Sequence, residues 1–198
     1  MFYPIMLKIE NKLIVVVGGG QVAHRKVKKL LEFGGTVRVV SPKIIDEFKD
    51  LQKEYKENIE FIYDIYNKKY IKDSHLVIGA TSSRNINEEI ARDCNSLNIL
   101  VNIVDSKDDS DFITPSIINN DNLTISISTL GSFPYLSKKI RIDMEKKYKK
   151  FDKEYMIILE EIRRITLDNY SHKTKEIMDK ALELDIVDLK EFLKELEK

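Results

Sequence analysis

A glycine-rich segment near the amino terminus has the residue types and spacing of a phosphate-binding turn. Residues 18–23 read Gly-Gly-Gly-Gln-Val-Ala, which fits the pattern G-x-G-x-x-G/A. Gly18 allows a tight turn, Gly20 lets the backbone approach a pyrophosphate, and the small Ala23 allows a helix to pack closely on a strand. Amides at the start of that helix then bind phosphate oxygens. We expect a dinucleotide to be held by Gly18, Gly20, Gln21, Val22 and Ala23.

The segment expected to bind the ribose carries no carboxylate. An acidic residue about twenty residues after the glycines usually binds the ribose hydroxyls, but residues 37–43 read Val-Arg-Val-Val-Ser-Pro-Lys. Lys43 or Arg38 would favour a 2′-phosphate and therefore NADP, whereas Ser41 would hydrogen-bond a free ribose. The residues leave this choice open, and we expect Ser41, Pro42 and Lys43 to contact the cofactor.

Two further polar segments follow apolar runs. Thr81 comes directly after the run 76–80, and Asp105 comes directly after the run 100–104, which contains Asn102. Ligands of open α/β sheets lie beyond the carboxyl ends of the strands, so we expect Thr81 and Asn102 to contact the cofactor. Asp105 faces the same expected crevice. An aspartate there is either a functional carboxylate or a turn residue, and the residues alone leave both possibilities open.

The elements that must position these residues alternate between strands and helices. Apolar runs predict strands over residues 13–17, 37–40, 60–63, 76–80 and 100–104. Helical spacing predicts helices over residues 21–33 and 83–97, the second capped by Asn85 with Glu88 three residues later. This alternation implies right-handed crossovers, and therefore an α/β fold with a Rossmann-like, doubly wound parallel sheet.

The pattern changes after residue 113. Residues 117–118 and 123–128 predict a short antiparallel pair, joined by the polar turn 119–122. Only helical patterns follow residue 135, and their apolar stripes are Ile158, Leu159, Ile162 and Ile165, then Phe192, Leu193 and Leu196. We expect a dinucleotide-binding domain over residues 1–113, a small central β/α region over 114–146 and a helical part over 147–198.

Composition narrows the classes of function. Lys plus Arg and Asp plus Glu number 33 each, so no net charge favours nucleic acid or an anionic membrane. Cys94 is the only cysteine, which excludes an internal disulfide and fits a reducing compartment. The start of the chain lacks the features of a signal peptide, and His24, His75 and His172 lack the spacing of a metal site. We expect a cytoplasmic protein with no resident metal and no membrane or nucleic-acid partner.

Several motifs taken together resemble those of precorrin-2 dehydrogenases, the NAD-dependent half of siroheme synthases. Residues 18–26, Gly-Gly-Gly-Gln-Val-Ala-His-Arg-Lys, are similar to the family's opening motif. Residues 102–105, Asn-Ile-Val-Asp, resemble its Asn-Val-Val-Asp segment, and residues 111–116 resemble its Ser-Phe-Ile-x-Pro-Ser. Residues 125–129 resemble the strand that follows. The resemblance runs in the family's order and covers residues 3–140.

The resemblance implies NAD-dependent oxidation of precorrin-2 to sirohydrochlorin, with insertion of Fe²⁺ into the product by some members. It also implies a homodimer that pairs through the central region, and it favours NAD over NADP. The family's catalytic aspartate falls on Asp105, which would take up a proton. Substrate-binding residues are expected at Ser128, Thr129, Lys138 and Lys139, with Arg141 as a further candidate.

Two features keep the sequence reading open. The chain departs from the family in the loop 129–134, where Leu130 and Phe133 replace smaller residues and change the shape expected of the loop. The alternative to an enzyme is a Rossmann module that senses NAD(H) without catalysis. Such a module would need the glycine turn but would not need Asp105.

Overall fold

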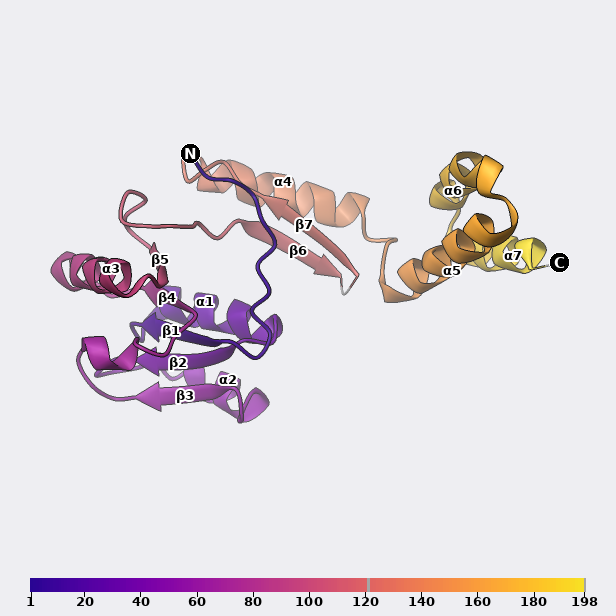
Figure 1. Cartoon of the computed structure of the whole chain (residues 1–198). Helices are drawn as coiled ribbons and strands as arrows, with labels where there is room; N and C mark the ends of the chain where they lie inside the picture. The colour runs from indigo at the N-terminus through magenta and orange to yellow at the C-terminus, as the bar shows by residue number, and fades with distance from the viewer. Residues whose placement is uncertain (121, 198) are drawn as a thin grey trace. The chain divides into compact units, whose positions relative to one another are not determined.

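The chain divides into two compact units, Met1–Ile113 and Thr114–Lys198, in a computed structural model that describes residues 1–120 and 122–197 (Figure 1). The division falls where the sequence pattern changes from alternating strands and helices to a hairpin followed by helices. Asp121, which belongs to the expected turn 119–122, lies outside the described residues.

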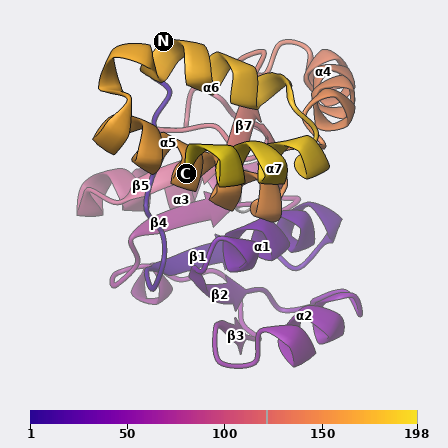
Figure 2. The same ribbon diagram turned by 90° about the vertical axis from the view of Figure 1, so that its right-hand side faces the viewer.

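The first unit is built on a parallel sheet of five strands. They are β1 (Leu13–Val17), β2 (Thr36–Val40), β3 (Ile59–Ile62), β4 (Leu76–Gly79) and β5 (Leu100–Ile103). Their order in the sheet is β3-β2-β1-β4-β5, which Figure 2 shows from its lower part upward. The strand order reverses between β1 and β4, and Val17 lies opposite both Val40 and Gly79. The carboxyl ends of β1, β2 and β4 therefore meet at a topological switch point, as the doubly wound fold requires.

Helices cover both faces of this sheet. The helices of the unit are α1 (Gln21–Glu32), α2 (Phe48–Glu54) and α3 (Arg84–Leu97), with a 3-10 turn at Lys68–Tyr70. Ala23 and Val27 of α1 pack on one face together with Phe48 of α2, while Ile90 and Cys94 of α3 pack on the other. The expected strands and helices are confirmed within two residues at each end. Helix α2 was not expected, because seven residues are too few to establish a periodicity.

The expected cap of α3 is wrong. Asn85 lies exposed inside the first turn, and the helix begins after Ser83, whose backbone N–H donates to the Thr81 hydroxyl at 3.1 Å. The Glu88 carboxylate, the expected partner in the capping box, instead accepts from Arg84 at 2.9 Å. The hydroxyl that accepts from the backbone just before α3 therefore belongs to Thr81, and Asn85 of the expected capping box does not supply it.

The second unit begins with a hairpin and a helix that packs on it. Strands β6 (Ser116–Asn120) and β7 (Leu123–Ile127) are antiparallel, and Ile118 lies opposite Ile125. Helix α4 (Pro134–Lys147) packs against both strands, and Figure 1 shows it lying along the hairpin. The antiparallel pair predicted from the sequence is confirmed. The boundary expected between residues 146 and 147 falls at the last residues of α4.

Three further helices complete the second unit. They are α5 (Lys153–Asn169), α6 (Thr174–Glu183) and α7 (Ile186–Leu196), with a 3-10 turn at Ser171–Lys173. Ile158 and Ile162 of the first apolar stripe and Phe192 of the second lie in one shared core around the buried Tyr155. The interpretation of both stripes as core-facing is therefore confirmed. Among the described residues, no helix has the length and apolar character needed to cross a membrane.

Candidate active site

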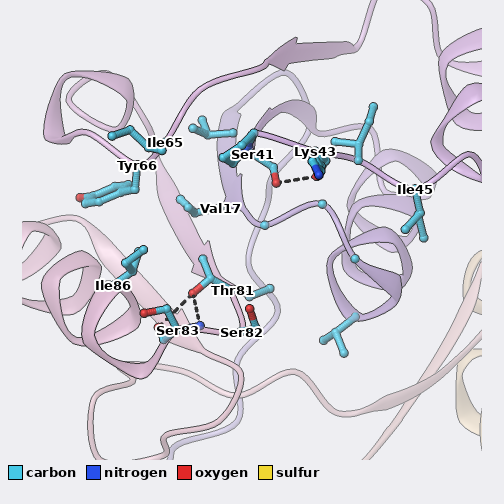
Figure 3. Close-up of a pocket in the computed structure, with 18 of the residues that line it drawn as sticks. Val17, Ser41, Lys43, Ile45, Ile65, Tyr66, Thr81, Ser82, Ser83 and Ile86 are labelled. Atoms are coloured by element: carbon cyan, nitrogen blue, oxygen red, sulfur yellow. Dashed lines mark hydrogen bonds between the residues drawn. The ribbon is translucent and has the colours of Figure 1, made fainter.

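A cavity of about 630 Å³ opens at the carboxyl edge of the parallel sheet, within the range typical of cofactor sites. Residues after all five strands line it. They are the glycine turn after β1, the turn at Ser41–Lys43 after β2, Ile65 and Tyr66 after β3, Thr81–Ser83 after β4, and Val104 after β5. Figure 3 shows the labelled side chains of these segments in separate groups around the cavity. The cavity therefore collects most of the residues that the sequence predicted for a dinucleotide.

The three glycines of the turn differ in what a side chain at each position would meet. Gly18 has a φ of +127°, and a Cβ there would lie 2.4 Å from the Ala80 carbonyl oxygen. A Cβ on Gly19 would lie 2.1 Å from the Lys43 carbonyl oxygen. By contrast, apart from Gly20 itself and its two chain neighbours, no atom of the described residues lies within 4 Å of a Cβ placed on Gly20. The fold itself needs the first two glycines, while the third leaves open space in the wall of the cavity.

Helix α1 presents its amino terminus to the same space. Gly20 precedes it in an extended conformation, and no side chain of the described residues caps the helix. Its first turn holds no acidic residue, so the amides of Gln21 and Val22 and the positive end of the helix dipole can bind an anion. Gly18, Gly20, Gln21 and Val22 all line the cavity, whereas Ala23 is buried beneath it against the sheet. This arrangement fits a pyrophosphate.

The turn after β2 is held by a serine. The Ser41 hydroxyl donates to the Lys43 carbonyl oxygen at 2.7 Å, and the Ser41 amide donates to the Ile62 carbonyl at 3.0 Å. Ser41, Pro42 and Lys43 all line the cavity. The Lys43 side chain is exposed and has no ion pair among the described residues. It is therefore the remaining basic candidate for a 2′-phosphate.

Arg38 is not a ligand of the cavity. Its guanidinium donates to Glu60 at 2.9 Å, to Asp73 at 2.9 Å and to the Tyr70 carbonyl oxygen at 3.0 Å. These partners hold Arg38 in the middle of β2, away from the carboxyl edge. The suggestion that Arg38 selects NADP is therefore wrong, because the side chain already neutralises two carboxylates of this unit.

A buried amide connects the segments after β4 and β5. Asn87 of α3 is 1% exposed. Its Oδ1 accepts from the Thr81 hydroxyl at 2.8 Å, and its Nδ2 donates to Asp105 Oδ1 at 2.9 Å. The sequence reasoning missed Asn87. The available signal was its spacing from Ile90 and Cys94, which places a polar side chain on the buried stripe of the helix.

Asp105 lies in the turn that follows β5 and is exposed. It is not among the residues that line the cavity, but its neighbour Val104 is, and Asn87 ties it to Thr81 at the cavity wall. Its described hydrogen bond comes from the Asn87 side chain rather than from a backbone amide. Asp105 also acts electrostatically on Arg84, whose pKa is raised chiefly by its hydrogen bond to Glu88.

Asn102 lies away from the cavity in the middle of β5, opposite Ile78. Its Nδ2 donates to the Phe112 carbonyl oxygen at 2.9 Å, and its buried Oδ1 has no hydrogen-bond partner among the described residues. The backbone of β5 is bound to the same returning segment, because Val101 donates to Asp111 and Ile103 donates to Ser110. The structure thus shows Asn102 as an anchor for the segment that follows β5.

The four residues expected to bind substrate all belong to the second unit. The Thr129 hydroxyl accepts from the Phe133 amide at 3.1 Å and contacts the buried Ser137 hydroxyl at 3.0 Å. The Ser128 hydroxyl accepts from the Leu130 amide at 3.0 Å. These hydroxyls shape the loop before α4. Lys138 and Lys139 are exposed on α4, where Lys139 lies 3.8 Å from Asp143 and Arg141 lies 2.7 Å from Glu145.

The histidines form no metal site in the described part of the chain. His24 packs its ring edge-on against Phe48, with 5.1 Å between the ring centres. No group of three or more His, Cys, Asp or Glu side chains suited to a metal ion occurs among the described residues. His24 therefore has a packing role at the base of α1.

The chain is similar to a family of NAD(P)-binding domains, to siroheme synthases and to a solved structure. The model of NAD_binding_7, a family of NAD(P)-binding domains, matches residues 5–116. The siroheme synthase of Psychrobacter cryohalolentis is 37% identical over 143 residues, covering 72% of this chain and 27% of the relative. That of Pseudoalteromonas translucida is 35% identical over 144 residues, covering 73% and 30%. The chain thus spans less than a third of the length of these relatives.

One solved structure is similar over the full chain. It is SirC, precorrin-2 dehydrogenase, which has 26% sequence identity and a TM-score of 0.74 and covers 99% of both chains. The similarity therefore includes the hairpin and the helices of the second unit as well as the parallel sheet.

Proposed function

The chain belongs to the NAD_binding_7 family of NAD(P)-binding domains, and from this premise we propose that it is a precorrin-2 dehydrogenase. The reaction is the NAD-dependent oxidation of precorrin-2 to sirohydrochlorin, a step of siroheme synthesis. The observation that carries the proposal is that a carboxylate is connected to the cavity that fits a dinucleotide. Asn87 is hydrogen-bonded both to Thr81, which lines the cavity, and to Asp105. Similarity to SirC, precorrin-2 dehydrogenase, over both units supports the same assignment.

The glycine turn and the start of α1 hold the cofactor in this proposal. The absence of a side chain at Gly20 leaves room for the pyrophosphate, which the amides of Gln21 and Val22 bind. Ser41, Pro42 and Lys43 border the ribose, and Thr81 borders the reacting end. Bound NAD⁺ supplies the hydride acceptor. The chain supplies orientation, which is a large part of the work in hydride transfer.

Asp105 is the proposed general base. Dehydrogenation of precorrin-2 removes one hydride and one proton, so a group on the protein must accept the proton. The Asp105 carboxylate follows the strand next to β4, at the edge of the sheet where the cavity opens. Asn102 supports this position from within β5 by anchoring the returning segment at Phe112, and we retain it as an indirect contributor to cofactor binding.

The substrate carries acidic side arms, which require basic or hydroxyl partners. We assign this role to Lys138 and Lys139 of α4 and to Ser128 and Thr129 of the preceding loop. Lys138 has no ion pair among the described residues, while Lys139 has a long one to Asp143. An exposed ammonium with a weak partner can exchange that partner for a carboxylate of the ligand at little cost.

The proposal includes two partners besides precorrin-2. Fe²⁺ is a second substrate, because the carboxylate that accepts a proton from the ring would also accept a pyrrole N–H proton during metal insertion. A second copy of the chain is the other partner, since β6 and β7 pair only with each other among the described strands and several large apolar side chains beside them are exposed. We place the reaction in the cytoplasm, which agrees with a single free cysteine, Cys94.

The decisive experiment mixes the purified full chain with precorrin-2 and NAD⁺. We expect the absorbance of sirohydrochlorin to rise together with an equal amount of NADH. Parallel reactions with NADP⁺ test the contribution of Lys43, and reactions with Fe²⁺ test metal insertion. Binding of NAD⁺ without any turnover of precorrin-2 would contradict the enzyme and favour a module that senses NAD(H).

A further inference from the structure

Asn87 has every hydrogen-bonding position of its side chain occupied. Its Oδ1 accepts from the Thr81 amide at 3.3 Å and from the Thr81 hydroxyl at 2.8 Å. Its Nδ2 donates to the Thr81 carbonyl at 3.2 Å and to Asp105 Oδ1 at 2.9 Å. An asparagine side chain has two donor hydrogens and two acceptor lone pairs, so this set of partners is complete.

The partners also fix which way the amide faces. If the side-chain amide were rotated by half a turn, Asn87 Oδ1 would face the carboxylate of Asp105 and the carbonyl of Thr81, so acceptors would face acceptors. The Asn87 NH₂ group would face the Thr81 backbone N–H, so donors would face a donor. Asn87 is 1% exposed, so water cannot compensate for those lost bonds. The buried network therefore holds a donor toward Asp105.

We propose that Asn87 is the positioning residue for Asp105. Its Nδ2 holds Oδ1 of the carboxylate and leaves Oδ2 as the oxygen that receives the proton from the substrate; this inference rests on the dehydrogenase activity proposed above. Because the same amide is bonded three times to Thr81, the carboxylate keeps a fixed place relative to the loop that lines the cofactor cavity. A general base must be held within hydrogen-bonding reach of the proton it removes.

Two of the other charged groups near Asp105, Arg84 and Asp109, already have partners. Arg84 donates to Glu88 at 2.9 Å and lies 3.9 Å from Asp109. Asp109 in turn accepts from the Ser106 hydroxyl at 2.5 Å. Lys107 and Asp108 complete the charged groups of the turn. Among the described residues, Asn87 is thus the side chain that donates to Asp105 directly.

A first test needs no substrate and no cofactor. In the ligand-free protein, the side-chain amide signals of Asn87 are followed by NMR as the pH is lowered. We expect them to move as Asp105 becomes protonated, and to stay in place in the Asp105→Asn variant, where Arg84, Glu88 and Asp109 are unchanged. Signals that ignore pH in the unmodified protein, or that move equally in the variant, would overturn the proposal.

A second test compares two substitutions of the same chemistry on one helix. Asn87→Asp keeps the size of the side chain but replaces the donor that faces Asp105 by an oxygen. Asn85→Asp adds the same charge two residues away, at an exposed position. We expect kcat to fall by about tenfold to a hundredfold for Asn87→Asp, the effect of one hydrogen bond to a charged group. The Asn85→Asp protein should stay within roughly twofold.

A double-mutant cycle separates positioning from a purely structural role. Asn87→Ala is measured alone and in the Asp105→Asn background, together with the melting temperature and the Kd for NAD⁺. If Asn87 acts through Asp105, its substitution costs no further turnover once Asp105 is replaced. A loss of the same size in both backgrounds would contradict the proposal. If the unmodified chain fails to oxidise precorrin-2, the proposed function fails while the NMR test still decides whether Asn87 holds Asp105.

Discussion

At the scale of single residues, Gly20 differs from Gly18 and Gly19 because the fold does not require a glycine at its position. Gly18 and Gly19 are required because a Cβ on either would meet a backbone carbonyl, whereas Gly20 faces open space at the cavity and the fold does not require a glycine there. The same contrast distinguishes Asp105 from its neighbours. It is bonded to a buried amide, whereas Asp108 on the same turn is exposed and has no described side-chain bond.

We predict that Gly20→Val abolishes NAD⁺ binding and leaves the fold intact. The valine side chain would fill the space where the pyrophosphate approaches the backbone, and it meets no atom of the described residues within 4 Å at its Cβ. Titration calorimetry with NAD⁺ and a thermal melt check the two halves of the prediction. Gly19→Ala is the matched control, because its Cβ clashes with the Lys43 carbonyl and should lower the melting temperature. Unchanged NAD⁺ affinity in Gly20→Val would disprove the site.

We predict that Asp105→Asn lowers the turnover of precorrin-2 by about 10² to 10⁴, the usual contribution of a general base. Asparagine retains an oxygen that can accept from Asn87, so the melting temperature and the Kd for NAD⁺ should barely change. Turnover is measured at saturating NAD⁺. Asp108→Asn removes the same charge from the same turn and should retain activity. Near-normal turnover in Asp105→Asn would leave Asp105 as a turn residue only.

At the scale of elements, a buried tyrosine hydroxyl connects α5 to the end of α6 in the second unit. The Tyr155 hydroxyl on α5 donates to the Ala181 carbonyl at 2.8 Å and to the Leu184 carbonyl at 3.2 Å. Burial raises the pKa of Tyr155, which favours the protonated hydroxyl that donates these bonds. The single hydroxyl proton is thereby shared between the carbonyl of Ala181, in the last turn of α6, and that of Leu184, which follows the helix.

We predict that Tyr155→Phe destabilises the chain by roughly 1 to 2 kcal/mol, because it leaves buried carbonyl oxygens unsatisfied. Urea unfolding followed by circular dichroism measures this change. Tyr148→Phe is the control, since its ring stacks on Phe151 but its hydroxyl has no described bond. The Kd for NAD⁺ should be unaffected, as the residues that line the cofactor cavity all belong to the first unit. Equal stability of the two variants would contradict the role given to the hydroxyl.

At the scale of the whole molecule, several large apolar side chains that follow the hairpin in sequence are exposed to solvent. Phe133 is 66% exposed and Tyr135 is 82% exposed at the start of α4, and Leu130 and Leu136 are also exposed. Exposed apolar side chains clustered along the sequence, next to unpaired strand edges, favour association with another chain. This agrees with a symmetric homodimer formed through residues 114–146, which remains a prediction.

We predict that the chain sediments as a dimer of 23.1 kDa subunits at micromolar concentration. Phe133→Asp should shift it to the monomer, because the charge would have to be buried in the contact. Val187→Asp introduces the same charge at an exposed apolar position of α7, outside residues 114–146, and should leave the dimer intact. A monomer in the unmodified chain, or dissociation by both variants, would contradict this contact.

Local patterns in the sequence determined the elements and the glycine turn. The strands of the first unit and its helices α1 and α3 follow from apolar runs and helical spacing, and Gly18–Ala23 follows from the sterics of a turn between a strand and a helix. These features depend on residues close together in the chain, so they can be read without the fold. The order of the motifs, from the glycine turn through residues 102–105 and 111–116 to residues 125–129, carried the resemblance to one family.

Only the tertiary structure decided how distant side chains pair. Arg38 is held by Glu60 and Asp73, which lie 22 and 35 residues away in sequence, and so cannot serve the cofactor. Asn87 meets Asp105 across 18 residues because β4 and β5 are neighbours in the sheet, and no local pattern encodes that adjacency. The sequence specified which residue types stand at the ends of the strands. The register of the sheet specified which of them reach one another, since hydrogen bonds act over a few ångströms in space and not along the chain.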